Sequence, residues 1–216
     1  MRITKVTLRQ QAAALPASSD NYLCQQCQLF SKCSYPFLHE TILMSAVDNN
    51  RILFVTSQPS LYEGAQGKQF SSPLGKHFKS YVLKAIGLRP EQCAFVSAIA
   101  CSSNKTTIAP QVEWCRAFVF QAIVRVMPSK IVLLGADAAR SVLCLKTPIL
   151  KDLTNMLHLV HVEDGKIGGI PAIVTYGLAY ALKDLNILQV IRQHIERFVY
   201  DKLETKVWPA MNIMNL

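Results

Sequence analysis

The stretch KIVLLGADAARSVLCL, residues 130–145, combines two kinds of hydrophobic pattern. Residues 130–135 form a short apolar run, rich in β-branched side chains and ending at a glycine, which is typical of a buried strand. Residues 136–145 then place apolar side chains three and four positions apart, as one face of a helix requires. A strand that runs directly into a helix is the building block of α/β folds.

The same alternation recurs along the chain. Further strands are predicted at residues 52–57, 94–99, 157–162 and 171–176, and further helices at 73–87, 109–126 and 183–203. This alternation predicts a three-layer α/β/α sandwich with a central, mostly parallel sheet of four to five strands. Ligands of such sheets bind beyond the carboxyl ends of the strands, so the loops after Ser57, Ile99 and Tyr176 are expected to carry the site.

Length and composition indicate one domain over residues 1–216, with an N-terminal segment at about 20–45 and a C-terminal tail at about 204–216. No apolar run reaches the roughly 18 to 20 residues that span a bilayer, and the opening MRITKVTLRQ lacks an apolar signal region. The net charge of +9 favours an anionic partner, with DNA first. We therefore expect a soluble, cytoplasmic, nucleoid-associated monomer with no membrane partner.

Seven cysteines, an odd number, do not suit a secreted disulfide framework. Cys24 and Cys27 form a CxxC turn, Cys101 follows the second predicted strand, and Cys115 lies in the helical segment after it. Two sulfurs from a tight turn and two distant ones can enclose zinc or a [4Fe–4S] cluster, and the spacing does not choose between them. Cys33 is either a spare thiol or an alternative ligand. Cys93 and Cys144 lie in apolar patterns and are expected to be buried free thiols in the core.

Three motifs follow one another in the chain. ILFVTSQPSLYEGAQGKQFSSPLGK is residues 52–76, KIVLLGADAARSVL is residues 130–143, and PAIVTYGLAYALKD is residues 171–184. With the cysteines, they resemble the iron–sulfur uracil-DNA glycosylases, family 4 of that superfamily, over roughly residues 20 to 200. In that family the first motif reads Gly-Glu-Ala-Pro-Gly, an acidic residue, Gly-x-Pro-Phe and a glycine that opens a helix. The last motif reads Thr-Tyr-His-Pro-Ala-Tyr-Leu-Leu.

The resemblance implies a DNA glycosylase, which binds DNA, flips a base into a pocket and hydrolyses its N-glycosidic bond. It also implies a [4Fe–4S] cluster, with zinc as the alternative, on four ligands: Cys24, Cys27, Cys101 and Cys115. Phe70 falls on the family's stacking phenylalanine, and Pro59 and Gly67 keep the geometry of the loop. Phosphate contacts are expected from lysines on the predicted DNA-facing loops: Lys68, Lys76, Lys79, Lys105 and Lys183.

Three chemical positions depart from the family pattern. Ser57 stands where the family has the acidic residue of Gly-Glu-Ala-Pro-Gly. The asparagine that reads the uracil edge falls at Ser97 or Ala98, and the histidine that supports the leaving base falls at Gly177. Loss of one preorganised donor costs about 3 kcal/mol, roughly a hundredfold in rate, so ordinary uracil excision is not expected.

Two hypotheses follow from these departures. The smaller side chains enlarge the pocket, so the enzyme would excise a bulkier pyrimidine, such as a hydroxymethylated or glycosylated one. The alternative is a catalytically inactive glycosylase fold that serves as a DNA- or protein-binding module. A third class is a zinc-bearing interaction protein without a DNA role.

The remaining candidate residues have individual expected roles. Gln58 would orient a water or read a base edge, and Glu63 would act as general base or stabilise a sugar cation. Hydroxyl donors and stacking faces are expected from Tyr62, Tyr176 and Tyr180, and the pocket is expected to include Ser57, Ser97, Ala98 and Gly177 beside Phe70. His194, on the last predicted helix, is expected at the surface.

Overall fold

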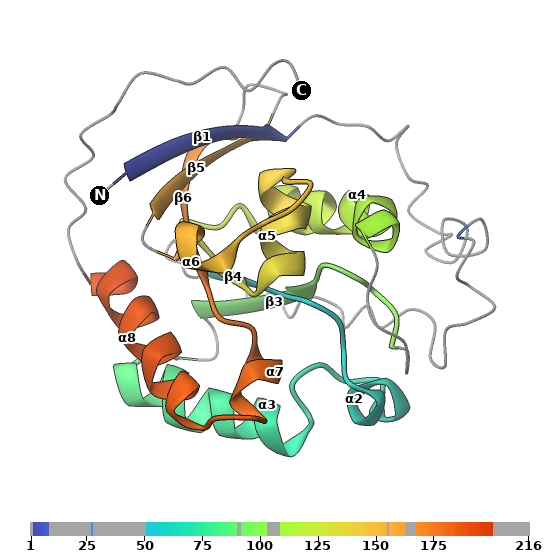
Figure 1. Cartoon of the computed structure of the whole chain (residues 1–216), viewed down its shortest axis with the longest axis vertical. Coiled ribbons are helices and arrows are strands. Elements are labelled where there is room, and N and C mark those ends of the chain that lie inside the picture. The colour runs from blue at the N-terminus through green and yellow to red at the C-terminus, as the bar shows by residue number, and fades with distance from the viewer. Residues whose placement is uncertain are drawn as a thin grey trace.

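The computed structural model describes residues 2–8, 27, 51–89, 92–102, 109–154, 156–162 and 167–200. Within these ranges the strands form one sheet of six, in the order β1-β5-β6-β4-β2-β3 (Figure 1). Neighbouring strands are parallel except β5 and β6, which are antiparallel. The strands are β1 (Arg2–Leu8), β2 (Ile52–Thr56), β3 (Cys93–Ser97), β4 (Lys130–Leu134), β5 (Met156–Val162) and β6 (Ile167–Thr175).

The five predicted strands are confirmed, but the prediction of four to five strands in the sheet is wrong by one. The extra strand is β1, which pairs in parallel with β5 at the edge of the sheet. The sequence does not predict β1, because RITKVTL has neither an apolar run nor a strict alternation of polar and apolar residues. Pairing with a neighbour decides this strand, and that information lies elsewhere in the chain.

The described helices are α2 (Leu61–Gln66), α3 (Pro73–His77), α4 (Ala109–Val126), α5 (Ala136–Leu143), α6 (Leu150–Leu153), α7 (Leu178–Ala181) and α8 (Asn186–Tyr200). The helix predicted at 73–87 is α3 followed by a π-helical segment, η2 (Phe78–Leu83), and a 3₁₀ turn, η3 (Lys84–Ile86). It ends at Gly87, whose φ of +74° is the left-handed conformation that glycine adopts at helix ends. No helix in these ranges combines the length and apolarity needed to cross a membrane.

Helices cover both faces of the sheet, as the predicted three-layer sandwich requires (Figure 1). Alternate residues of each strand point to opposite faces. Leu53 and Val55 of β2 join a buried cluster with α4 and α5, whereas Ile52 and Phe54 join a second cluster with η2 and α8. The fold class is therefore confirmed, and one buried cluster packs on each face of the sheet.

The carboxyl ends of the parallel strands meet at one edge of the sheet. The backbone N–H of Ala98 donates to the carbonyl of Thr56 at 2.8 Å, and the N–H of Gly135 donates to the carbonyl of Thr175 at 2.9 Å. These hydrogen bonds hold the loops after β2, β3, β4 and β6 against one another. The loops after Ser57 and Tyr176 lie on either side of the end of β4, and both contribute residues to one pocket.

Candidate active site

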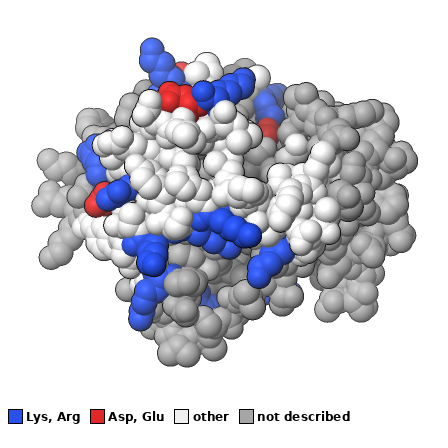
Figure 2. All heavy atoms as spheres, turned by 90° about the horizontal axis from the view of Figure 1, so that it is seen from below, with Lys and Arg blue, Asp and Glu red and all other residues white. Residues whose placement is uncertain are grey.

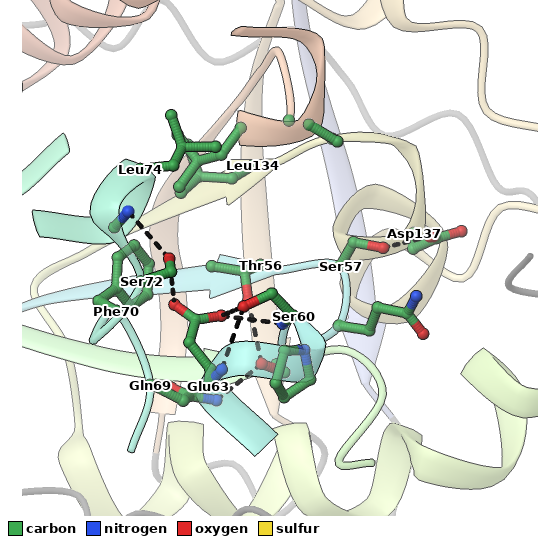
Figure 3. Close-up of a pocket in the computed structure, with 18 of the residues that line it drawn as sticks. Thr56, Ser57, Ser60, Glu63, Gln69, Phe70, Ser72, Leu74, Leu134 and Asp137 are labelled. Atoms are coloured by element: carbon green, nitrogen blue, oxygen red, sulfur yellow. Dashed lines mark hydrogen bonds between the residues drawn. The ribbon is translucent and has the colours of Figure 1, made fainter. Parts of the chain in front are cut away.

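A pocket of about 450 Å³ opens at this edge of the sheet, within the roughly 300–1,000 Å³ of small-molecule sites (Figure 3). Its walls come from the ends of β2, β3 and β4, from the loop after β6, and from α2, α3, α5 and α7. Of the predicted site residues it brings together Ser57, Gln58, Glu63, Phe70, Ser97 and Gly177.

Phe70 supplies an aromatic wall and sits in an uncommon backbone conformation. Its φ is +56°, and its side chain is 5% exposed. The ring packs on Phe95 with centroids 4.5 Å apart, and the Nζ of Lys79 lies 5.5 Å from its centroid. A positive φ is unfavourable for a bulky residue, so the surrounding packing must hold the ring in place.

Gly75 is part of that packing. A Cβ added to Gly75 would lie 2.6 Å from the Cα of Phe70, closer than real side-chain contacts come. Ser72 caps the N-terminus of α3 by accepting a hydrogen bond from the Gly75 N–H at 3.1 Å. The start of α3 therefore lies directly against the Phe70 backbone.

Glu63 ties the N-termini of two helices together. Its Oε2 accepts hydrogen bonds from the backbone N–H and the hydroxyl of Ser60, both at 2.9 Å, which completes a capping box on α2. Its Oε1 accepts from the Ser72 hydroxyl at 3.1 Å. The sequence Ser-x-x-Glu carries this capping signal, and the carboxylate expected to act in catalysis is held by three donors.

A second carboxylate lines the pocket, and sequence reasoning missed it. Asp137 lies in the first turn of α5, and its Oδ2 accepts a hydrogen bond from the Ser57 hydroxyl (Figure 3). Its Oδ1 lies 3.3 Å from Nη1 of Arg140, with which it forms an ion pair. Asp137 follows the glycine at the end of a predicted strand, a position at the ligand edge that the sequence pattern does contain.

A chain of three polar side chains connects β2, β3 and the Phe70 loop. Ser97 Oγ lies 3.0 Å from Thr56 Oγ1, and the amide nitrogen Nε2 of Gln69 donates to Ser97 Oγ at 2.7 Å. Of the two positions expected to replace the family's asparagine, only Ser97 lines the pocket. Ala98 is fully buried in the core cluster beside α4 and lies outside the lining. Gln69 was not among the expected residues.

Gly177 leaves space at the pocket without needing to be glycine. Its φ of −73° suits any residue, and a Cβ placed there would meet the Cα of Gly135 at 3.4 Å, an ordinary contact. The structure therefore supplies no steric reason for the missing side chain.

The three tyrosines differ in position. Tyr180 lines the pocket, whereas Tyr62 and Tyr176 lie outside the lining. Tyr62 is on α2 and is 50% exposed. Tyr176 stacks on the ring of His194, whose Nδ1 lies 2.9 Å from Thr175 Oγ1. His194 is half-buried, and burial and the charge of Arg197 lower its pKa.

Lysines surround this side of the molecule. Figure 2 looks at it from the side of α2 and α3, and Lys and Arg side chains outnumber acidic ones there. Lys68, Lys76 and Lys183 are exposed, and Lys79 is half-buried against aromatic rings. Lys105 lies outside the described residues.

The cysteine ligand set can be followed only in part. Cys101 is half-buried against the cluster that contains the buried Cys115, whereas Cys24 lies outside the described residues and Cys27 is half-buried. Among the described residues, no three His, Cys, Asp or Glu side chains form a group that could hold a metal ion. Cys93 is half-buried and Cys144 is exposed, so the prediction of a buried thiol is wrong for Cys144.

Comparisons with known proteins agree with the fold. A family model described as the uracil DNA glycosylase superfamily matches residues 44–189, more than half of the chain. The chain is also 20% identical over 176 residues to a type-4 uracil-DNA glycosylase of Sulfurisphaera tokodaii. That alignment covers 81% of this chain and 78% of the relative.

Proposed function

The chain belongs to the uracil-DNA glycosylase superfamily, and on this basis we propose that it binds DNA, flips out a pyrimidine larger than uracil and hydrolyses its N-glycosidic bond. The observation that carries the proposal is the pocket of about 450 Å³, with Phe70 as one wall and no side chain at Gly177. A hydroxymethylated or glycosylated pyrimidine fits this description.

The volume argument rests on backbone positions. The space beside Gly177 is bounded by the backbone of Leu134 and Gly135, which another residue at 177 would contact without overlap. Gly177 itself lines the pocket, so a histidine at this position would add a side chain at the pocket wall. Its absence removes a donor for a leaving uracil and leaves room for a substituent on the ring.

Two carboxylates and one amide are available for the reaction. Glu63 of α2 and Asp137 of α5 both line the pocket. Gln58 also lines it and makes no hydrogen bond within the described residues. We assign water activation to Asp137, which accepts from Ser57 and pairs with Arg140, because Glu63 accepts three hydrogen bonds that hold two helix termini together. Water adds to C1′ of the sugar and gives a proton to the carboxylate, and the electron pair of the broken bond leaves with the base. Gln58 would orient this water.

DNA would lie across the face that carries the exposed lysines. Lys68, Lys76 and Lys183 supply positive charge for phosphates, which strengthens binding without reading sequence. Leu182 lines the mouth of the pocket and is 75% exposed. An exposed apolar side chain at this position can fill the gap that a flipped base leaves in the stack.

We further propose that Cys24, Cys27, Cys101 and Cys115 hold a [4Fe–4S] cluster, with zinc as the alternative. The support is that Cys115 of α4 belongs to a buried cluster against which Cys101 packs. The group would join the N-terminal segment to the core and takes no part in the steps above. Iron and sulfide analysis, with a brown absorption band, would support the cluster, and one equivalent of zinc would contradict it.

The test is incubation with duplexes that carry uracil, 5-hydroxymethyluracil, 5-hydroxymethylcytosine or their glucosylated forms, followed by alkaline cleavage at abasic sites. We expect strand breaks with at least one modified base. Asp137→Asn should remove them, while Glu63→Gln should lower the melting temperature more than the rate. DNA binding without abasic product on any duplex would overturn the proposal.

A further inference from the structure

Gln69 is a buried side chain with only half of its amide paired. It is 5% exposed, and its Nε2 donates to Ser97 Oγ at 2.7 Å. Its Oε1 is buried and accepts no hydrogen bond from any residue that the structure describes. A buried acceptor without a donor is unfavourable, so each one in a native protein calls for a partner, such as a ligand or an ordered water.

The surroundings of Gln69 hold the amide in place. Ser97 is 3% exposed and lies 3.0 Å from Thr56 Oγ1, so the partner of the amide is itself fixed from β2. Gln69 immediately precedes Phe70, and both side chains line the pocket (Figure 3). A base that packs on the Phe70 ring therefore brings its edge toward the Gln69–Ser97 pair.

We propose that Gln69 reads the Watson–Crick edge of the flipped pyrimidine. Oε1 accepts from an N–H of the base, and the second hydrogen of Nε2 donates to the neighbouring acceptor. Uracil-type bases present this pair as N3–H beside O4, and cytosine-type bases present it as N4–H beside N3. If the Gln69 amide is turned by 180°, so that its oxygen and nitrogen exchange places, one of the two atoms still has no partner.

This assignment rests on the proposed function and adds a base-reading group to it. Ser97 stands at the position expected for asparagine, but its side chain has a hydroxyl and no amide. Gln69 returns an amide to the same place from a different loop, 28 positions away in the chain. The site therefore keeps the ability to select a base by its edge, while the space beside Gly177 admits a substituent.

The test is equilibrium binding to duplexes that carry one 2′-fluoro nucleotide, which prevents cleavage. The bases are 5-hydroxymethyluracil, its N3-methyl derivative, 5-hydroxymethylcytosine and thymine. Wild-type protein should bind its preferred hydroxymethyl base roughly 5- to 150-fold more tightly than a base without the edge donor. Preference for the uracil or the cytosine duplex identifies which edge is read.

The deciding variant is Gln69→Leu, which is similar in size and has no unpaired polar atom. It should melt at the wild-type temperature or above and bind 5-hydroxymethyluracil and its N3-methyl derivative alike, which a purely structural role for Gln69 would not produce. Thymine has the same edge as 5-hydroxymethyluracil, so the preference for the hydroxymethyl group should remain. Wild-type discrimination against the N3-methyl derivative that survives in Gln69→Leu overturns this assignment alone. Wild-type protein that binds all four duplexes equally overturns the proposed function together with it.

Discussion

Gly75→Ala should displace the stacking phenylalanine and thereby damage the pocket. The new Cβ would lie 2.6 Å from the Cα of Phe70 and 2.9 Å from its carbonyl carbon. Carbon atoms pack best at about 3.5–4.0 Å, so the two backbones must separate by about 1 Å. Overpacking of this kind costs about 1–3 kcal/mol. For a domain of this size that corresponds to a loss of about 2–12 °C in melting temperature.

The effect on the site should exceed the effect on stability. A displacement of about 1 Å at a binding constellation can lower its performance about a hundredfold. We would measure thermal unfolding by circular dichroism, and binding to a duplex that carries a non-cleavable 5-hydroxymethylpyrimidine.

Gly67→Ala is the matched control. Gly67 has no atom within 4 Å of an added Cβ, but its φ of +62° makes alanine unfavourable by about 1–2 kcal/mol. It should therefore melt lower, like Gly75→Ala, yet keep its affinity for the duplex. Unchanged affinity in Gly75→Ala, with melting lowered as in the control, would refute the view that α3 positions Phe70 for the base.

Three further changes have defined outcomes. Burial lowers the pKa of His158 from 6.5 to about 4. Between pH 6.5 and pH 4 the imidazole of His158 is therefore protonated in the unfolded chain but not in the folded one. Stability should be complete above pH 6.5 and fall by up to about 3 kcal/mol toward pH 4 in urea titrations, and His158→Gln should flatten this slope. Gly177→His should melt near wild type, because its Cβ has room, but competition binding should show loss of the bulkier bases. Lys76→Ala and Lys183→Ala should each reduce the slope of log affinity against log salt by about 1, equally for all sequences.

Strands with their own apolar run could be predicted, and those that depend on a partner could not. The runs at 52–57 and 130–135 are buried on both faces and correspond to β2 and β4, which lie inside the sheet. β1 lies at the edge and carries polar residues at several positions, so only its pairing with β5 reveals it. The same reason explains why the sheet is wider than expected.

The candidate site divides along similar lines. Phe70 and Gly177 lie in motifs with a recognisable order, and both reach the pocket. The hydrogen bond from Ser57 to Asp137 joins positions 80 residues apart, and no local pattern records such a contact. Glu63 shows the opposite case, because its capping box with Ser60 is a local signal that indicates a structural role before any catalytic one.

The central claim is that this chain releases a modified pyrimidine rather than uracil. The most direct measurement is mass spectrometry of the free bases released from duplexes that carry uracil, 5-hydroxymethyluracil or 5-hydroxymethylcytosine, with Asp137→Asn as the inactive control. We predict a free hydroxymethylated base from the wild type, none from the control, and little or no free uracil. Release of uracil alone, or of no base from any duplex, would contradict the account.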